Sequence, residues 1–459
     1  MEISRDKMIL FLTHIAITFT VFYICVSDSF SGLGLAVFGM IELIYSLILC
    51  RNKKYAIITC GSAFVLCAVS FFRVGNVFTL FNYIAIVLLL SSNIVLASGD
   101  VSLLSLLCAL VAPFKFISAP FSFIAREETP SKKLIFLKIL LAAVIIIPCV
   151  AVVLILLSSA DPVFFRGIDS YLHKFTIGIS FFTVGRIWIS VLVSIYIFGA
   201  FFAAAVPQEK QKSERKGSPS SQIPTVLTFI LLAIYAVFSI LQIKYLFFGA
   251  KLPAGITYAE YARRGFFELL AVGAVNIAVV LAGNKMSAGK TASVTRYVLC
   301  AMTAFLILCS FQRMLLYYRL HGLTELRLFV FICLIFELAG LIITVLFLMR
   351  PKFCILRSYL TLALIFWLTV NLINIPALTA KGQIDAYFAG KRSDLNYVFS
   401  LSFDASDEIF RLVGEDGEVG ENAKNYFLEG SRITEGISWQ SQNLSILRYK
   451  QLASEIYGN

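Results

Sequence analysis

The chain has 459 residues, of which 59% are hydrophobic and only 14% are charged. Soluble domains carry about 25% charged residues, so this composition excludes an ordinary soluble globular protein. The net charge of +12 does not indicate a nucleic-acid partner, because an excess of Lys and Arg in a membrane protein marks its cytoplasmic loops. About eleven apolar runs reach the roughly 20 residues that a membrane-spanning helix needs. We therefore predict an all-α, polytopic membrane protein with the lipid bilayer as its surroundings.

Six spans are predicted before residue 207, at about 8–26, 32–50, 55–72, 77–97, 134–157 and 179–206. A cleavable signal peptide is the alternative for the first run. The segment that follows it, Ser27-Asp28-Ser29-Phe30, lacks an Ala-x-Ala cleavage site, which favours a retained span.

Residues 101–125 are apolar enough to span, but Pro113, Lys115 and Pro120 interrupt them. If this segment spanned, every later loop would change sides. The Lys- and Arg-rich stretch 207–222 would then face outward, against the positive-inside rule. We therefore predict an interfacial or re-entrant segment.

Four parts are predicted along the chain. Residues 1–206 form an N-terminal membrane bundle, 207–222 a cytoplasmic linker rich in charge and Ser, and 223–378 a second bundle. The second bundle has five spans, at about 225–248, 265–283, 297–317, 328–349 and 353–378. Residues 379–459 are polar and predict a small helical domain. We find no internal repeat of the kind that inverted-repeat transporters show.

An inside N-terminus and eleven spans place the C-terminal domain outside the cytoplasm. Four polar stretches then share the outer face: 158–175, 249–264, 319–327 and the tail. This convergence predicts a site for a ligand or partner at the extracytoplasmic face.

The fifth span closes on Asp161-Pro162. Proline disfavours helical geometry at the preceding residue, so the helix ends there. Asp161 would bind a cation or act as a base at the outer mouth. Alternatively, Asp161 caps a short segment that Pro162 begins.

The eighth span opens with Tyr261, Arg263, Arg264 and Glu268. The arginines would form a mouth that binds an anion or a lipid headgroup, or they anchor the helix by reaching lipid phosphates. Arg264 and Glu268 are four residues apart, so they share a helix face and can pair. Asn276 lies two turns deeper, where a buried amide needs a partner.

The ninth span closes near Arg313 and Tyr317, which share a helix face. Gly322 allows a tight turn, and Thr324 is placed to cap the tenth helix, which begins near Arg327. These residues complete the predicted polar site at the outer face.

Charges also lie inside predicted spans. Arg186, Lys244 and Glu337 belong to the sixth, seventh and tenth spans, and Glu42 to the second. Intramembrane charges indicate a functional site by default, and Arg186 with Glu337 is one possible pair.

The ten cysteines lie in or beside apolar runs, and no Cys-x-x-Cys occurs. We expect them to be small buried residues and not disulfides or metal ligands. The three histidines, His14, His173 and His321, lack metal-site spacing, and no nucleotide-binding motif is present. No metal and no cofactor are predicted.

Four motifs resemble a family of bacterial multi-pass membrane proteins, domain of unknown function 4173: Ser-Ala-Asp-Pro-Val-Phe (159–164), Tyr-Ala-Arg-Arg-Gly-Phe-Phe-Glu-Leu (261–269), Arg-Met-x-x-Tyr with Gly-Leu-Thr-x-x-Arg (313–327) and Trp-Gln-Ser-Gln-Asn-Leu-Ser (439–445). The resemblance covers about residue 150 to the C-terminus. It implies the bacterial cell membrane and supplies no activity. Arg264 stands where the family usually has an acid, which argues against catalysis there.

Three functions remain open. A non-enzymatic protein that binds a ligand or protein partner is favoured, and the partner's identity does not follow from the sequence. An enzyme for a lipid or lipid-linked substrate at the outer face is the second, and a secondary transporter is the third. The ligand would come from the lipid or the cell envelope.

Overall fold

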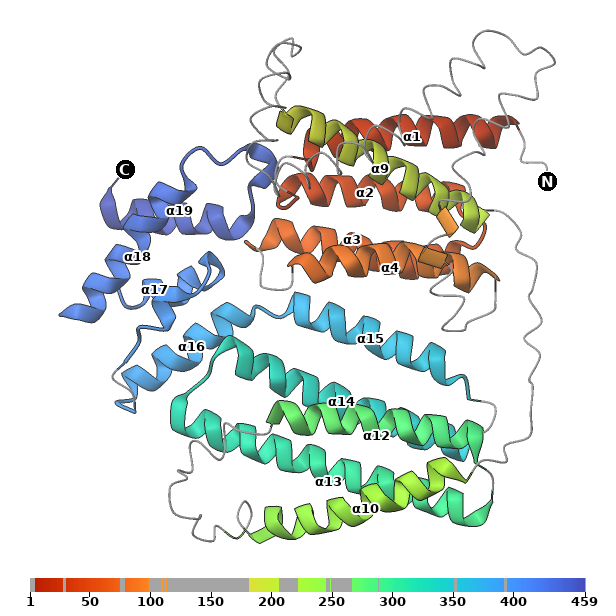
Figure 1. Ribbon diagram of the computed structural model, residues 1–459. Coiled ribbons are helices and arrows are strands. Elements are labelled where there is room, and N and C mark those ends of the chain that lie inside the picture. Colours follow the sequence, from red (N-terminus) through yellow and green to blue (C-terminus); the bar gives the residue numbers. More distant parts are fainter. Residues whose placement is uncertain are drawn as a thin grey trace, which may run out of the picture. The chain divides into compact units, whose positions relative to one another are not determined.

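The structure is a computed structural model that describes residues 5–27, 30–74, 79–98, 109–110, 112–113, 181–205, 222–244, 248, 266–287, 289–350, 353–391 and 394–458. These residues form helices and connecting turns, and no strand occurs among them (Figure 1). The predicted fifth span and nearly all of the 101–125 segment and the linker lie outside the described residues.

Six helices in the described part of the chain are long and apolar enough to cross a membrane: Lys53–Phe72, Gly185–Ala205, Glu268–Met286, Lys290–Arg319, Glu325–Met349 and Ile355–Leu372. Four shorter apolar helices accompany them, at Ile9–Cys25, Leu33–Leu49, Phe81–Leu96 and Pro224–Ile240. Many side chains on these helices are large, apolar and exposed, such as Ile58 and Ile342. A lipid bilayer accounts for this exposure because it solvates apolar side chains, and the chain is a membrane protein.

The chain divides into two compact units. The first contains the described residues up to 211 together with 435–447. Its helices are α1 (Arg5–Cys25), α2 (Leu33–Leu49), α3 (Lys53–Phe72), α4 (Thr79–Ser98) and α9 (Phe181–Ala205). Helix α1 packs against α2 and α9, and α4 packs against α3 and α9. Their core is rich in phenylalanine, including Phe11, Phe22, Phe198 and Phe201.

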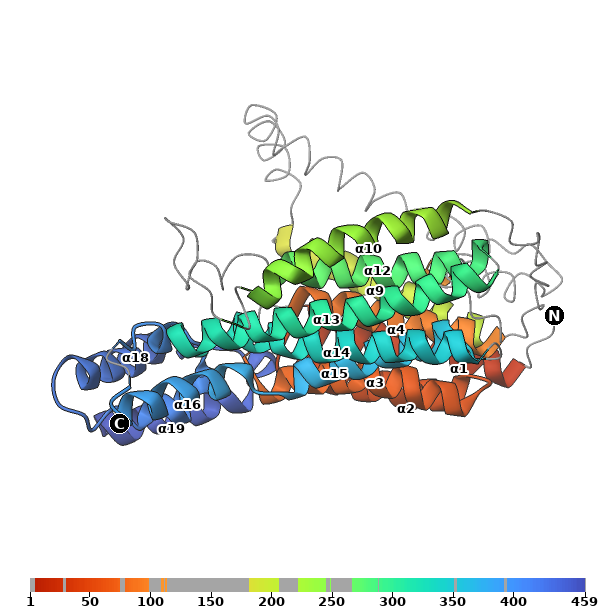
Figure 2. The same ribbon diagram turned by 90° about the horizontal axis from the view of Figure 1, so that it is seen from below.

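The second unit contains the described residues of 212–434 and 448–459. Its apolar helices are α10 (Ile223–Gln242), α12 (Phe266–Met286), α13 (Lys290–His321), α14 (Glu325–Met349) and α15 (Ile355–Leu372). Helices α10, α12, α13 and α14 lie side by side (Figure 2). Leu299, Leu306, Met314 and Leu334 are buried among them.

The turn between α13 and α14 forms as the sequence predicted. Gly322 ends α13 with a φ of 72°, a left-handed conformation that glycine adopts at little cost. The Thr324 side chain caps α14 by accepting a hydrogen bond from the backbone N–H of Arg327 at 3.4 Å.

The predicted end of the eleventh span is wrong. We expected it to run to residue 378, but α15 ends at Leu372 and a new helix, α16 (Ile375–Phe388), begins. Asn374 caps α16 by accepting from the N–H of Ala377 at 3.1 Å, and Pro376 occupies its first turn. Both residues favour a helix start, and they override the continuous apolar pattern.

The residues after α15 are helical, as predicted. They comprise α16, the short helices η2 (Val398–Ser400), η3 (Phe403–Ala405) and α17 (Ser406–Phe410), then α18 (Glu418–Thr434), η4 (Trp439–Ser441) and α19 (Leu444–Tyr457). Apart from 435–447, they share a separate hydrophobic core in the second unit, with Ile384, Phe427 and Tyr449 fully buried. We call residues 375–434 and 448–458 the tail domain.

Tyr449 lies at the centre of the tail domain. Its hydroxyl is 2.8 Å from the carbonyl oxygen of Tyr426 and 2.6 Å from that of Phe427, and it donates to them. Burial raises the pKa of the Tyr449 hydroxyl well above its ordinary value. The phenol therefore stays neutral and keeps its role as a donor.

Gly430 on α18 leaves the space that Tyr449 fills. A Cβ at this position would lie 2.2 Å from the Tyr449 oxygen and 2.8 Å from Cε1 of Phe403. We expect Gly430→Ala to destabilise the tail domain by about 1–3 kcal/mol through overpacking. Hydrogen–deuterium exchange over residues 395–458 in the full chain would measure the loss.

Gly414→Ala is the matched control, because a Cβ at Gly414 would meet nothing within 4 Å. Equal exchange in the two variants would contradict the packing argument.

Candidate functional site

The structure describes some of the predicted site residues and leaves others outside the described part of the chain. Asp161, Tyr261 and Arg263 lie outside the described residues. Glu268 is exposed in the first turn of α12, and Lys244 is exposed just after α10.

The turn after α13 brings three predicted residues together. The Arg327 guanidinium lies over the Tyr317 ring, 4.1 Å from its centroid, a cation–π contact. Arg327 also donates to the carbonyl of Gly322, and its backbone N–H is the group that Thr324 caps. These bonds hold the turn between α13 and α14 in place. The Arg327 side chain therefore has a structural role there.

Arg313 lies deeper and is almost fully buried. Its guanidinium donates to the side-chain oxygen of Gln242 on α10, at 3.0 Å from Nη2 and 3.3 Å from Nε. Arg313 therefore joins α13 to α10.

The tail domain packs on the same turn. The Tyr397 hydroxyl accepts from the backbone N–H of Glu325 at 3.2 Å. Gln383 of α16 donates to the Leu323 carbonyl. The 322–325 turn and the tail domain are therefore at the same end of the second unit.

The motif 439–445 belongs to the first unit. The Gln442 carbonyl accepts from the N–H of Leu33 at 2.9 Å. Gln440 donates to the carbonyl of Ile24 at 3.3 Å, and Ser445 to that of Phe72 at 3.0 Å. The motif thus covers the end where α1 and α3 finish and α2 begins.

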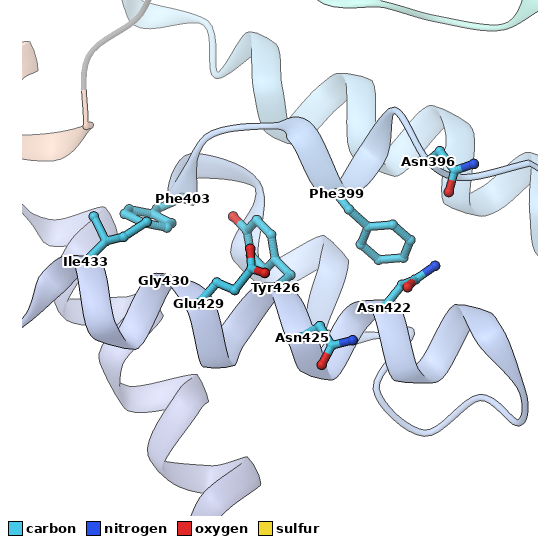
Figure 3. Close-up of a pocket in the computed structure, with 9 residues that line it drawn as sticks. All are labelled: Asn396, Phe399, Phe403, Asn422, Asn425, Tyr426, Glu429, Gly430 and Ile433. Carbon is cyan, nitrogen blue, oxygen red and sulfur yellow. The ribbon is translucent and has the colours of Figure 1, made fainter.

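The tail domain contains a pocket of about 440 Å³ (Figure 3). Three asparagines line it: Asn396, Asn422 and Asn425. Figure 3 shows the Phe399 ring facing the two asparagines of α18, with Tyr426 and Glu429 further along the same helix. The remaining lining residues are Phe403, Gly430 and Ile433.

Sequence reasoning missed this pocket. Asn422, Asn425 and Glu429 recur at helical spacing, a signal that could have placed them on one face. Asn396 and Phe399 come from a separate element, and no local pattern assigns them to the same site.

A buried polar cluster also lies within the first unit. Glu42 on α2 accepts from Thr18 at 2.7 Å, and its other carboxyl oxygen is 2.9 Å from Nε2 of His14. His14 is fully buried between the rings of Tyr45 and Phe201. The sequence places Glu42 in an apolar run, but no local pattern predicts its partners.

The second unit has its own buried polar groups. The Asn276 side chain accepts from the Tyr235 hydroxyl at 2.7 Å and donates to Thr303 at 3.1 Å. It thereby connects α10, α12 and α13. The carboxyl group of Glu337 on α14 lies against Gly273 of α12.

Arg186 of α9 donates to the Ser27 hydroxyl at 2.9 Å and to the Tyr23 carbonyl at 3.2 Å. Arg186 belongs to the first unit and Glu337 to the second. Their pairing stays a prediction.

The described residues contain no group of three or more His, Cys, Asp or Glu that could hold a metal ion. The described cysteines are free thiols, and most are buried.

Comparison with known proteins gives one family. The model described as Domain of unknown function (DUF4153) matches residues 60–412. No curated protein and no solved structure gives a significant match. The family suggested by the short motifs, domain of unknown function 4173, is therefore not the one found. The match includes the third and fourth predicted spans, where no motif was noticed, and it leaves out the 439–445 motif.

Removing the hydrogen bond between Thr18 and Glu42 tests whether the buried cluster stabilises the first unit. Thr18→Val removes the hydroxyl while keeping the shape of the side chain. We expect a loss of about 1 kcal/mol, the typical size of an interhelical hydrogen bond in a membrane. Reversible unfolding of the full chain with a denaturing detergent would measure it.

Thr13→Val on the same helix is the control, because Thr13 is exposed and bonds only to the Leu10 carbonyl. Equal stability of the two variants would show that the cluster contributes little.

Proposed function

The chain belongs to the DUF4153 family, which has no assigned function, and from that premise we propose that it is a multi-pass bacterial cell-membrane protein that binds a ligand. The site is the tail-domain pocket, on the extracytoplasmic face. The ligand is a neutral, hydroxyl-rich group of the cell envelope, such as a sugar unit.

One observation supports the ligand class: the amides of Asn396, Asn422 and Asn425 share a pocket with aromatic rings. Each amide offers both donors and an acceptor, which matches the mixed donors and acceptors of sugar hydroxyls. The rings of Phe399 and Tyr426 offer apolar faces for C–H groups.

The charge of the pocket argues against an anionic headgroup. Among the described residues that line it, Glu429 is the single charged one, and none is Lys or Arg. Phosphate recognition normally uses Arg or Lys side chains. A phosphate would also lie near the Glu429 carboxylate and be repelled.

The proposed orientation follows from the distribution of basic residues. In the first unit, Arg51 lies between α2 and α3, and Lys53 and Lys54 begin α3, at the end opposite to the 439–445 motif. In the second unit, Lys285 and Lys290 flank the α12–α13 turn, at the end of α13 opposite to the tail domain. The positive-inside rule places such loops in the cytoplasm. With eleven spans, the N-terminus is inside and the tail domain outside.

Topology is tested with single cysteines at four exposed positions in intact cells. We expect an impermeant thiol reagent to label Lys391→Cys and Glu435→Cys and to leave Lys54→Cys and Lys290→Cys unlabelled. The parent chain sets the background from its own cysteines. Labelling of the second pair alone would invert the proposed orientation.

Ligand binding is tested on the full chain in detergent with a panel of neutral mono- and disaccharides. Loss of one neutral hydrogen bond costs about 1 kcal/mol, so Asn422→Ala and Asn425→Ala should each raise Kd roughly fivefold. Isothermal titration calorimetry measures Kd directly.

Lys424→Ala is the control, since Lys424 is an exposed residue of the same helix outside the pocket. Heat from phosphate or phospholipid headgroups, with none from any sugar, would overturn the proposed ligand class.

A further inference from the structure

Glu337 lies midway along α14, with a full half of the apolar helix on either side. Both of its carboxyl oxygens are inaccessible to water and have no hydrogen-bond partner among the described residues. Polar side chains inside a membrane normally pair with one another or face water. Glu337 does neither.

Gly273 of α12 makes room for this carboxyl group. A Cβ at Gly273 would lie 2.0 Å from Oε1 of Glu337, which is closer than atoms can approach. Glycine is therefore the residue that fits this position with the carboxyl group in place. The acid lies between two helices and not in the lipid.

Helices α12, α13, α15 and α16 pack against α14, and none of them supplies a counter-charge among the described residues. On α12, Glu268 and Lys285 are in the first and last turns, more than one turn from Gly273. On α16, Lys381 and Asp385 belong to the tail domain.

The basic groups of α13 are engaged elsewhere. Arg296 donates to the carbonyls of Gly283 and Ser287, and Arg313 donates to Gln242. Arg319 lies in the last turn of the helix, and Lys290 begins it.

Three further titratable groups lie on α14 and α15. The Tyr359 hydroxyl of α15 donates to the Gly340 carbonyl at 2.8 Å, and Arg357 lies at the start of that helix. Cys333 lies one turn from Glu337 on α14. A neutral thiol and a phenol do not balance a carboxylate.

An isolated carboxylate in a medium of low dielectric constant costs many kcal/mol, and the group binds a proton instead. A metal cation would need several further oxygen ligands, whereas these oxygens have no polar partner. We propose that Glu337 is a proton-binding site inside the second unit, protonated at neutral pH. This proposal goes beyond the proposed ligand binding and does not depend on it.

Glu42 is the internal control in the same chain. It too is buried in an apolar helix, but both of its oxygens are engaged, with Thr18 at 2.7 Å and His14 at 2.9 Å. The Glu42 carboxyl group thus has polar partners on α1, and the described neighbours of Glu337 offer none. The two acids should therefore differ in protonation.

The experiment is modification of the full-length protein in vesicles with the hydrophobic reagent dicyclohexylcarbodiimide. The protonated carboxyl group gives its proton to a carbodiimide nitrogen, and its oxygen bonds to the central carbon. Nothing leaves, so the peptide gains the mass of one reagent molecule. Peptide mass spectrometry at a series of pH values measures the fraction modified at each acid.

We expect Glu337 to be modified readily at neutral pH and Glu42 to be modified far less, because hydrogen bonds to Thr18 and His14 hold the Glu42 carboxyl group. Modification of Glu337 should fall as pH rises. Gly273→Ala, which displaces the carboxyl group, should shift that pH profile while the Glu42 profile stays unchanged.

A second measurement does not depend on reagent access. The infrared C=O band of a protonated carboxylic acid should be present in the parent chain and absent from Glu337→Gln. Glu42→Gln should keep it. A parent chain without this band, equal modification of both acids, or modification independent of pH would overturn the proposal. Suppression of modification by Na⁺ at constant pH would show a cation site in its place.

Discussion

The constraint on which this structure depends is the lack of water inside the bilayer. Backbone groups there must bond within their own helix, and polar side chains must find partners on neighbouring helices. Asn276 illustrates the result, because its two hydrogen bonds reach Tyr235 on α10 and Thr303 on α13. Glu42 does the same between α1 and α2. Such pairs decide which helices can be neighbours, because the surrounding lipid makes apolar contacts between helices poorly selective.

Hydroxyl side chains can make their hydrogen bonds within their own helix. Ser190, Ser194 and Ser310 each donate to the backbone carbonyl four residues earlier in their own helix. They need no partner from another helix and therefore specify no neighbour. The informative polar residues are those whose groups cannot be satisfied in this way, namely carboxylates, amides and imidazoles. Glu337 stands apart from all of these because both of its oxygens lack a partner. Other described residues, such as Asn93 and Gln442, have one buried polar atom without a partner, whereas Glu337 has two on the same carboxyl group. A buried polar group of this kind calls for an explanation.

The sequence predicted local features well and non-local ones poorly, for physical reasons. Gly322 and Thr324 act on the residues next to them, so the end of α13 and the start of α14 could be placed from the sequence. The end of α15 was misplaced because apolar periodicity received more weight than the cap at Asn374. The partner of His14 is 28 residues away, and that of Asn276 is 41 residues away on one side. Single-sequence patterns do not contain such distances.

The candidate site residues also divide into local groups and groups that come from distant parts of the sequence. Tyr317, Thr324 and Arg327 are close in sequence and contact one another in the turn between α13 and α14, while their place in a site stays a prediction. The tail-domain pocket joins Asn396 to asparagines on α18 and depends on the packing of the domain core around Tyr449. That packing follows from the whole domain, and no short motif reveals it.

Helix α14 connects the two proposed activities of the second unit. Its first residue, Glu325, donates to the hydroxyl of Tyr397, which is adjacent in sequence to Asn396 of the pocket. Glu337 lies on the same helix about 18 Å further along, at 1.5 Å per residue. A continuous helix is stiff over this length, so a ligand that shifts the 396–397 segment acts on the same element as a proton that leaves Glu337. Coupling between distant sites needs such a shared element, whose arrangement both sites influence. Helix α14 meets the first part of this requirement, because it has the Glu325–Tyr397 bond at one end and the Gly273 contact in its middle.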